Sequence, residues 1–301
     1  MPGGPTRIVD RWLGGRRNSD AAVVAAQRAV AHLKPAVVVT GGSRGIGHAI
    51  AQCFASHGHH VAIVARNADE LANAALEIER QTGQHVLTIS CDLTSPKAYA
   101  IISQELEQAG YYLDVLVNNA GLGLAGPFVE QDEADIAQLI ELNILVLTSL
   151  CRHSLPAMLA RRRGGLLNVA SLGAYVPGPH QAAYYASKAY VVSLTEAIAA
   201  ENYGSGVRFC VLAPGPVETG FHAQMGADTS RYRQIIPALS PDAVARSAYR
   251  GYNFGLRVVT PGWLGPFSHA ALRILPHPIS VPLMAWLLKR DAESNNDKLG
   301  P

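Results

Sequence analysis

The sequence predicts an α/β protein built as one domain around a doubly wound parallel sheet, and three observations carry that prediction. An apolar strand at residues 35–40 runs into a glycine-rich turn, and a helix with apolar residues at Ile46, Ile50 and Phe54 follows. Further short apolar stretches then alternate with amphipathic helical stretches as far as residue 262. Apolar residues make up 49% of the 301 residues, which is enough for a large core without disulfide bonds.

Helices are expected between the predicted strands in a regular order. The strands after the first are expected at residues 61–65, 85–90, 113–117, 165–170, 207–213 and 257–260. The later helices are expected at residues 68–81, 95–109, 133–161, 183–203 and 242–252. Ligands of such sheets bind beyond the carboxyl ends of the strands, where the strand order reverses. Candidate site residues are therefore those that directly follow a strand.

The chain divides into three predicted parts, namely an N-terminal arm at residues 1–34, the sheet domain at 35–262 and an apolar C-terminal extension at 263–301. The arm begins with a glycine- and arginine-rich stretch that we expect to be loosely ordered. It continues as a helix that Asn18 or Ser19 can cap. Because this helix precedes the first strand, we expect it to pack on the domain or on a second subunit.

Charge, cysteine spacing and hydropathy limit the function classes. A formal net charge of +2 gives no indication of nucleic-acid binding. The four cysteines form no C-x-x-C pair, so free thiols in a reducing compartment are expected. His57, His59 and His60 crowd one turn, which indicates a polar loop rather than a metal site, and no metal is expected. Neither a secretory signal nor an apolar run of about 20 residues is seen, so we expect a cytoplasmic protein without a transmembrane segment.

The glycine turn predicts a phosphate-binding loop. Gly41 allows the turn, while Gly45 and Gly47 let a diphosphate approach the backbone and the positive end of the following helix. The spacing is G-x-x-x-G-x-G, which departs from the dinucleotide pattern G-x-G-x-x-G. The turn also lacks the Lys-Ser/Thr pair of a P-loop, which argues against nucleoside triphosphate hydrolysis. On this motif alone, a purely structural turn is the alternative.

Arginine stands where NAD-binding proteins carry an acidic residue. Arg66 follows the second strand, and the first carboxylate after it is that of Asp69. Arg66 and Arg44 could together clamp a 2′-phosphate, which favours NADP over NAD as cofactor. The alternative is a pair of solvated surface arginines. After the third strand, Asp92 and Leu93 could contact the adenine amino group.

The fourth strand ends in the sequence Asn118-Asn-Ala-Gly121. We expect the amides and the glycine of this segment to brace the edge of the sheet against the cofactor. The alternative is that they only end the strand, because amides and glycine are ordinary turn formers.

The most informative residues follow the fifth strand. Ser171 ends that strand, and Tyr184 and Lys188 lie four residues apart at the start of the next helix, so they share one face. A phenol, with an ordinary pKa of about 10, is a poor acid or base at neutral pH unless positive charge stabilises its phenolate. Lys188 supplies that charge, and Ser171 can hydrogen-bond the substrate oxygen. Tyr185 is no substitute, because Ala189 lies four residues after it.

Together these motifs resemble the short-chain dehydrogenase/reductase family. The resemblance covers residues 34–254 and rests on Thr40-Gly-Gly-Ser-Arg-Gly-Ile-Gly47, Asn118-Asn-Ala-Gly121, the Ser171, Tyr184 and Lys188 set, and Pro214-Gly-Pro-Val-Glu-Thr219. It implies a Rossmann-type sheet of about seven strands. It also implies dimers or tetramers formed through the long helices, and a nicotinamide cofactor.

The resemblance implies a role for each matched residue. Tyr184 would be the general acid/base, and Lys188 would lower its pKa and hold the nicotinamide ribose. Ser171 would orient the carbonyl, and Asn143 would hold a water in a proton relay to Lys188. Judged by its position alone, Asn143 could equally be a polar helix residue with a satisfied amide. The residues expected to bind the dinucleotide are Gly41, Ser43, Arg44, Gly45, Ile46, Gly47, Arg66, Asp92, Leu93, Asn119, Ala120, Gly121, Tyr184, Lys188, Pro214, Gly215, Val217 and Thr219.

Residues 216–238 are expected to form a mobile lid over the substrate. This segment is mostly apolar, which favours an apolar or acyl ketone as substrate, with surface packing as the alternative role. Its apolar residues are Phe221, Met225, Tyr232, Ile235 and Ile236, with Arg231 and Arg233 between them. His180 could face the pocket or the solvent, and we assign it no role.

The C-terminal extension is apolar but interrupted by Pro276, Pro278 and Pro282. It resembles the tail of a subgroup that includes acyl and steroid ketoreductases. Three roles compete, in this order: it covers the substrate pocket, it covers a partner subunit, or it lies on a membrane surface.

Three function classes follow from these motifs. An NADP-dependent oxidoreductase acting on a carbonyl or alcohol is favoured, because the glycine loop and the Ser171, Tyr184 and Lys188 set occur in one chain. A non-catalytic NADP-binding sensor or scaffold would keep the loop but would not need Tyr184 and Lys188. A hydrolase built on Ser171 would need a G-x-S-x-G elbow, which this sequence lacks there.

Overall fold

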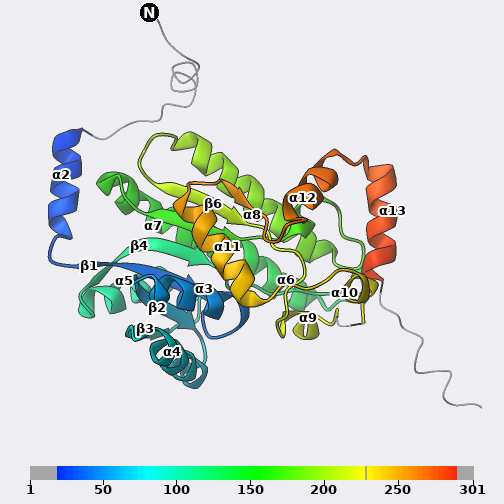
Figure 1. Cartoon of the computed structure of the whole chain (residues 1–301), viewed down its shortest axis with the longest axis horizontal. Helices are drawn as coiled ribbons and strands as arrows, with labels where there is room; N and C mark the ends of the chain where they lie inside the picture. Colours follow the sequence, from blue (N-terminus) through cyan, green and yellow to red (C-terminus); the bar gives the residue numbers. More distant parts are fainter. Residues whose placement is uncertain (1–18, 228, 290–301) are drawn as a thin grey trace, which may run out of the picture.

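A computed structural model describes residues 19–227 and 229–289, and the chain folds around one parallel sheet (Figure 1). Its seven strands lie in the order β3-β2-β1-β4-β5-β6-β7, so the strand order reverses between β1 and β4. This confirms the predicted fold class. The strands are β1 (Lys34–Thr40), β2 (His60–Ala65), β3 (Val86–Ser90), β4 (Tyr111–Asn118), β5 (Gly165–Val169), β6 (Arg208–Leu212) and β7 (Val258–Val259).

Helices cover both faces of the sheet, as a doubly wound fold requires. On one face lie α3 (Gly45–Ser56), α4 (Ala68–Thr82) and α11 (Pro241–Asn253). On the other lie α5 (Ala98–Gln108), α8 (Ala182–Glu201) and a long helix made of α6 (Glu133–Ile140), the π-helical turn η2 (Glu141–Val146) and α7 (Leu147–Arg161). The long helix was predicted as one element, and the π turn inside it is the detail that periodicity missed.

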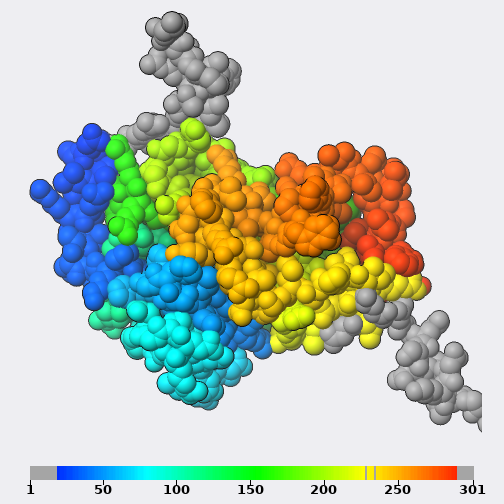
Figure 2. Space-filling view, in the orientation of Figure 1, coloured from blue at the N-terminus to red at the C-terminus, as the bar shows by residue number. Residues whose placement is uncertain are grey.

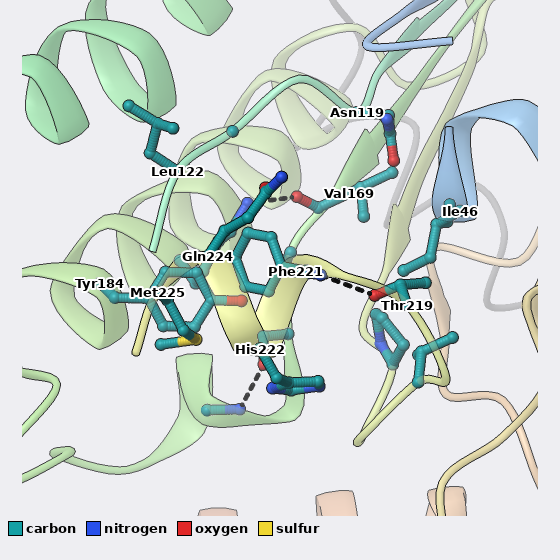
Figure 3. Close-up of a pocket in the computed structure, with 18 of the residues that line it drawn as sticks. Ile46, Asn119, Leu122, Val169, Tyr184, Thr219, Phe221, His222, Gln224 and Met225 are labelled. Carbon is teal, nitrogen blue, oxygen red and sulfur yellow. Dashed lines mark hydrogen bonds between the residues drawn. The ribbon is translucent and has the colours of Figure 1, made fainter. Parts of the chain in front are cut away.

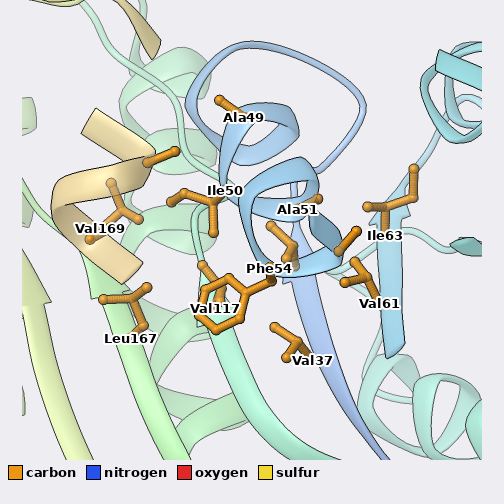
Figure 4. Packing of buried hydrophobic residues seen from close by; sticks show 14 of the residues in the cluster. Val37, Ala49, Ile50, Ala51, Phe54, Val61, Ile63, Val117, Leu167 and Val169 are labelled. Atoms are coloured by element: carbon orange, nitrogen blue, oxygen red, sulfur yellow. The ribbon is translucent and has the colours of Figure 1, made fainter. Parts of the chain in front are cut away.

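The first strand is apolar throughout because both of its faces are covered. Val37 and Val39 enter the core on the α3 side, whereas Ala36 and Val38 enter the core on the α5 side. Phe54 of α3 is 1% exposed and lies among the side chains of β1 and β4 (Figure 4). Because side chains alternate along the strand, one short apolar run contributes residues to two separate cores.

The predicted N-terminal helix packs on its own domain. It is α2 (Asp20–Ala29), and Ser19 caps it by accepting a hydrogen bond from the Ala22 N–H at 3.3 Å. Gln27 Nε2 donates to the carbonyl oxygen of Arg161 at the end of α7, at 3.1 Å. The helix ends at Ala29, earlier than the apolar spacing suggested, and residues 1–18 lie outside the described part.

The C-terminal extension forms two helices, α12 (Gly265–Ile274) and α13 (His277–Leu288). Proline lies in the first turn of each helix, where its missing N–H costs no hydrogen bond. The inner faces of the two helices pack on the cluster of Val176, Tyr185 and Tyr232. The residues that make this contact are Leu272, Met284, Leu287 and Leu288.

Among the described residues, one helix is long and apolar enough to cross a membrane. It spans Glu133–Arg161, and its buried residues include Leu139, Leu150 and Met158. These side chains pack in the interior of the fold, so part of the hydropathy of this helix reflects core positions, but only 33% of its most apolar stretch is buried.

We expect Phe54→Ala to lower the free energy of unfolding by about 3–5 kcal/mol, because it removes a fully buried ring and leaves a cavity between α3 and the sheet. Urea denaturation measures this change. Phe254→Ala is the matched control: its ring is 82% exposed, so a change within about 0.5 kcal/mol is expected. Equal losses in the two variants would contradict the described core.

Candidate active site

A cavity of about 890 Å³ lies at the carboxyl ends of the strands, where the sequence analysis placed the ligand. It extends from Arg66 and Asp92, beyond β2 and β3, past the glycine turn to Tyr184 on α8. The lid and the two C-terminal helices line its far end, and Figure 3 shows Phe221 and Met225 of the lid beside Tyr184. Of the residues predicted to bind the dinucleotide, all but Gly47 line this cavity.

The glycine turn has the conformation that a phosphate-binding loop requires. Gly41 and Gly45 have φ angles of +63° and +59°, which other residues rarely adopt. A side chain on Gly47 would overlap the Gly41 carbonyl and the amide of Asn119. No side chain caps the start of α3, and its first turn holds no acidic residue, so its N–H groups remain available to an anion. A diphosphate group therefore fits this turn.

Asn119 holds the glycine turn against the end of β4. Its Nδ2 donates to the carbonyl oxygens of Thr40 and Gly41 at 3.0 and 3.1 Å. Its neighbour Asn118 points the other way, into the core, where its Nδ2 donates to Asn168 Oδ1 at 2.8 Å. The two adjacent amides thus have different structural roles, which the sequence motif does not distinguish.

Two arginines and two carboxylates line one end of the cavity. Arg44 and Arg66 are both exposed there. Hydrogen bonds from the backbone and side chain of Thr94 lower the pKa of Asp92, and the charge of Arg66 acts in the same direction. Glu70, which the sequence analysis did not single out, accepts a hydrogen bond from Ser43 at 3.4 Å.

Arg44 also reaches the lid. When the amide of Gln224 is oriented with its oxygen toward the guanidinium, Oε1 accepts hydrogen bonds from Nη1 and Nη2 of Arg44 at 2.8 and 3.1 Å. Gln224 ends the short helix α9 (Phe221–Gln224). The sequence offered only a weak signal for this contact, namely one amide in a mostly apolar lid.

The three residues predicted to carry the chemistry lie together. Ser171 follows β5 and accepts a hydrogen bond from the Gly173 N–H at 3.1 Å. It also hydrogen-bonds the hydroxyl of Tyr184. Lys188 is 6% exposed, its Nζ donates to the carbonyl oxygen of Val169 at 2.9 Å, and it lies 5.8 Å from the centre of the Tyr184 ring.

Burial controls the protonation of Tyr184 and Lys188. It raises the pKa of Tyr184 above its ordinary value, although the hydrogen bond from Ser171 acts in the opposite direction. It lowers the pKa of Lys188 to about 8. The structure thus differs from the expectation that Lys188 lowers the pKa of Tyr184, because desolvation of the phenol outweighs the other contributions. The phenol is therefore protonated at neutral pH.

Asn143 lies in the π-helical turn η2, beside Gly121 and Lys188. Its Oδ1 accepts from the Leu122 N–H at 2.8 Å, and its Nδ2 donates to the Leu122 carbonyl oxygen at 2.8 Å and to Ser187 Oγ at 3.0 Å. The side chain therefore fixes the segment after β4 to α8. Its place within a π turn agrees with the frequent occurrence of such turns at functional sites.

The lid places an apolar wall opposite Tyr184. The Phe221 ring lies 5.7 Å from the Tyr184 ring, and Met225 lies beside it (Figure 3). Tyr232, on α10 (Arg231–Ile235), hydrogen-bonds His222 Nδ1 through its hydroxyl at 2.8 Å. Ile236 also lines the cavity. Ile235, predicted as part of the same wall, is instead 54% exposed.

Gln181 is a cavity residue that the sequence analysis missed. It lies three residues before Tyr184, directly before α8, and is 2% exposed. Its Nε2 has no hydrogen-bond partner among the described residues. The sequence signal that could have identified Gln181 is its position, a polar side chain about one helical turn before the predicted acid/base Tyr184.

His180 and His57 lie outside the cavity. His180 has a φ of +65°, and its carbonyl oxygen accepts from the Gly126 N–H at 2.8 Å, so it shapes the loop before α8. His57 stacks on Tyr249 with the ring centres 3.9 Å apart. The cavity lining includes neither residue.

The short chain dehydrogenase family profile matches residues 35–230. The chain is 35% identical over 196 residues to 17-beta-hydroxysteroid dehydrogenase type 3 of Danio rerio, a match that covers 64% of this chain and 63% of that protein. It is 31% identical over 245 residues to a very-long-chain 3-oxoacyl-CoA reductase of Laccaria bicolor, with 78% and 69% covered. The chain spans less than two thirds of the length of the first curated relatives that it matches.

Solved structures agree with the fold. A short-chain dehydrogenase from Sphingobium yanoikuyae, described in complex with NADPH, superposes with a TM-score of 0.71 at 27% identity. The superposition covers 87% of this chain and 99% of that one. The arrangement of strands and helices around the cavity is therefore shared with a dinucleotide-binding protein.

Proposed function

Because the chain belongs to the short chain dehydrogenase family, we propose that it is an NADP(H)-dependent oxidoreductase that reduces an apolar or acyl ketone to a secondary alcohol. One observation carries the proposal. Tyr184, whose hydroxyl is hydrogen-bonded to Ser171 and whose ring centre lies 5.8 Å from Nζ of the buried Lys188, shares a cavity with a glycine turn that can hold a diphosphate. A sensor or scaffold protein would have no use for the first of these features.

The residues of the chain perform the proton half of the reaction. The bound cofactor supplies the hydride that forms the new C–H bond. Ser171 donates a hydrogen bond to the carbonyl oxygen, and Tyr184 gives that oxygen its proton as the alcohol forms. The charge of Lys188 stabilises the phenolate that remains. Burial raises the pKa of Tyr184, so the phenol carries its proton at neutral pH before the carbonyl is reduced.

The preference for NADP rests on Arg44 and Arg66. Both residues line the cavity, and their guanidinium groups could hold the 2′-phosphate of the cofactor, with the diphosphate at the glycine turn and the start of α3. Asp92 would contact the adenine, and the turn at residues 214–219 would contact the nicotinamide carboxamide. Glu70 opposes this preference, because its carboxylate shares the same end of the cavity.

The substrate class follows from the far end of the cavity. Beyond Tyr184 its walls are apolar and come from the lid and the C-terminal helices. The names of the two relatives above describe a steroid and a long acyl chain as substrates, which are both apolar. The residues that form these walls are Phe221, Met225, Tyr232, Ile236, Leu272, Leu283, Met284, Leu287 and Leu288.

We propose a cytoplasmic homodimer or homotetramer. The four free cysteines are compatible with a reducing compartment. Ile140 and Leu145 on the long helix are 40% and 61% exposed, so this helix can offer apolar area to a second copy.

We expect Tyr184→Phe to reduce kcat by at least about a hundredfold, because the ring remains but the proton donor is lost. NADPH binding, followed by fluorescence titration, is expected to stay nearly unchanged. Turnover is measured with a panel of ketones, from small diketones to acyl thioesters and steroids. An active Tyr184→Phe enzyme would contradict the assignment, and a wild type that binds NADPH but reduces no ketone would favour the sensor.

The pH dependence of ketone reduction is expected to report Lys188. Burial lowers its pKa to about 8, so its charge is present below that pH and is lost above it. Reductive kcat/KM is therefore expected to be level at neutral pH and to fall about tenfold per pH unit above pH 8. A rate that stays level through the next full pH unit would contradict this role.

Arg66→Asp is expected to raise the Kd for NADPH about tenfold or more while leaving that for NADH unchanged or lower, because a carboxylate repels the 2′-phosphate and can accept from a ribose hydroxyl. Parallel calorimetric titrations with the two cofactors measure the ratio. Arg66→Gln separates loss of the guanidinium from the added negative charge. An unchanged ratio of the Kd for NADPH to the Kd for NADH would show that Arg66 does not determine the cofactor preference.

A further inference from the structure

The two C-terminal helices are apolar on their outer faces as well as on their inner faces. On α12, Phe267 and Ile274 are 71% and 80% exposed and lie seven residues apart, on one side of the helix. On α13, Ile279 and Trp286 repeat this spacing and are 59% and 50% exposed. Trp263, just before α12, is 81% exposed. A helix that is apolar on all sides normally has cover on all sides.

We call this outer surface the tail surface. It consists of Trp263, Leu264, Phe267, Ile274, Ile279, Leu283 and Trp286, which are 48% to 81% exposed. The two helices lie together at one end of the molecule (Figures 1 and 2). Scattered exposed apolar residues need no explanation, but a cluster of this kind indicates an interaction site.

The charges around the tail surface are positive. Residues 257–289 contain no aspartate or glutamate. Arg257, Arg273 and Lys289 in this segment are exposed, and Arg231 lies over the Trp286 ring at 5.5 Å. Glu196, whose charge acts on His269 of α12, belongs to α8 and is half-buried. The described segment that carries the tail surface thus holds exposed cations and no carboxylate, and Asp291, Glu293 and Asp297 follow it in the sequence.

The cavity reaches the same surface. Ala271 on α12, Leu283 on α13 and Ile236 in the lid line the cavity and are also exposed. The cavity therefore opens between the lid and the two helices, next to the tail surface. An apolar molecule could pass through this opening without crossing water.

We propose that the tail surface binds an anionic lipid bilayer, with the apolar side chains at the boundary between headgroups and acyl chains. Exposed tryptophans bordered by arginine and lysine have the composition of an interfacial membrane contact. A second copy is a poorer occupant, because a two-fold contact would bring Arg273 and Lys289 of one copy close to the same cations of the other. Lipid binding does not depend on the proposed function. If the protein also reduces an apolar ketone, the same contact would let that substrate enter the cavity from the bilayer, and this second step rests on the proposed function.

The first test is co-sedimentation of the full chain with vesicles of phosphatidylcholine alone or mixed with phosphatidylglycerol. Binding to the anionic vesicles is expected. Phe267→Ser/Ile274→Ser should lower the partition coefficient by about tenfold or more, because binding scales with the apolar area inserted. Val24→Ser/Leu76→Ser is the matched control: these side chains are 44% and 49% exposed on α2 and α4, away from the tail (Figure 1), and binding should be unchanged.

The charge contribution has its own variant. Arg273→Gln/Lys289→Gln is expected to weaken binding to the anionic vesicles by about tenfold and to leave binding to phosphatidylcholine unchanged. Equal loss on both vesicle types would overturn the electrostatic part of the proposal.

Tryptophan fluorescence reports the contact directly. In a Trp12→Phe background, Trp263 and Trp286 are the only tryptophans of the chain. Quenching by phosphatidylcholine with brominated acyl chains, mixed with phosphatidylglycerol, is expected. Absence of quenching and of co-sedimentation would overturn the proposal. If Phe267→Ser/Ile274→Ser also reduced the mass of the lipid-free protein in sedimentation equilibrium, a second copy would be the occupant.

Activity separates this proposal from the proposed function. Reduction of a water-soluble ketone should be the same for wild type and for Phe267→Ser/Ile274→Ser, because neither residue lines the cavity. Lipid binding by a protein that reduces no ketone would refute the function and leave the lipid contact standing. Ketone reduction by a protein that binds no lipid would refute the lipid contact and leave the proposed function standing.

Discussion

Where β1 pairs with β4 at the middle of the sheet, a single hydroxyl ties the ends of the two strands together, and the site depends on this contact. Thr40 Oγ1, at the end of β1, donates to the Val117 carbonyl oxygen at 3.2 Å and accepts from the N–H groups of Asn119 and Ala120 at 3.0 and 3.1 Å. Val117 belongs to β4, and β1 and β4 are neighbours at the point where the strand order reverses. The contact therefore fixes the glycine turn against residues 119–121, next to Lys188 of α8, and positions the proposed dinucleotide-binding turn relative to the proposed catalytic residues.

The chemistry of the site comes from burial more than from pairing. Tyr184 and Lys188 are both removed from water, and desolvation moves their pKa values in opposite directions, upward for the phenol and downward for the ammonium. The two values therefore move apart, so that at neutral pH the phenol keeps its proton and the lysine keeps most of its charge. The carbonyl oxygen of Val169 holds the lysine in place without neutralising it. The glycine turn offers a diphosphate backbone N–H groups at the start of α3, where no side chain caps the helix.

The C-terminal helices connect the site to the surface. Leu272 and Met284 face the cavity, whereas Ile274 and Trp286 on the same helices face outward. The extension therefore has two apolar contacts to satisfy, and the body of the domain satisfies one of them. The sequence suggested that the extension covers the substrate pocket, a partner subunit or a membrane surface. These roles are compatible, because the inner faces of the helices cover the pocket while their outer faces stay exposed.

The sequence by itself determined the sheet, the glycine turn and the Tyr184 and Lys188 pair, because periods of two and of about 3.6 residues and the four-residue spacing on a helix are local properties. It also placed Arg66 and Ser171 at strand ends. Only the tertiary structure decided that Ile235 points outward, that Gln181 and Gln224 reach the cavity, and that desolvation dominates the pKa of Tyr184. These depend on contacts between segments far apart in the chain, and burial is a property of the assembled fold that no local pattern contains.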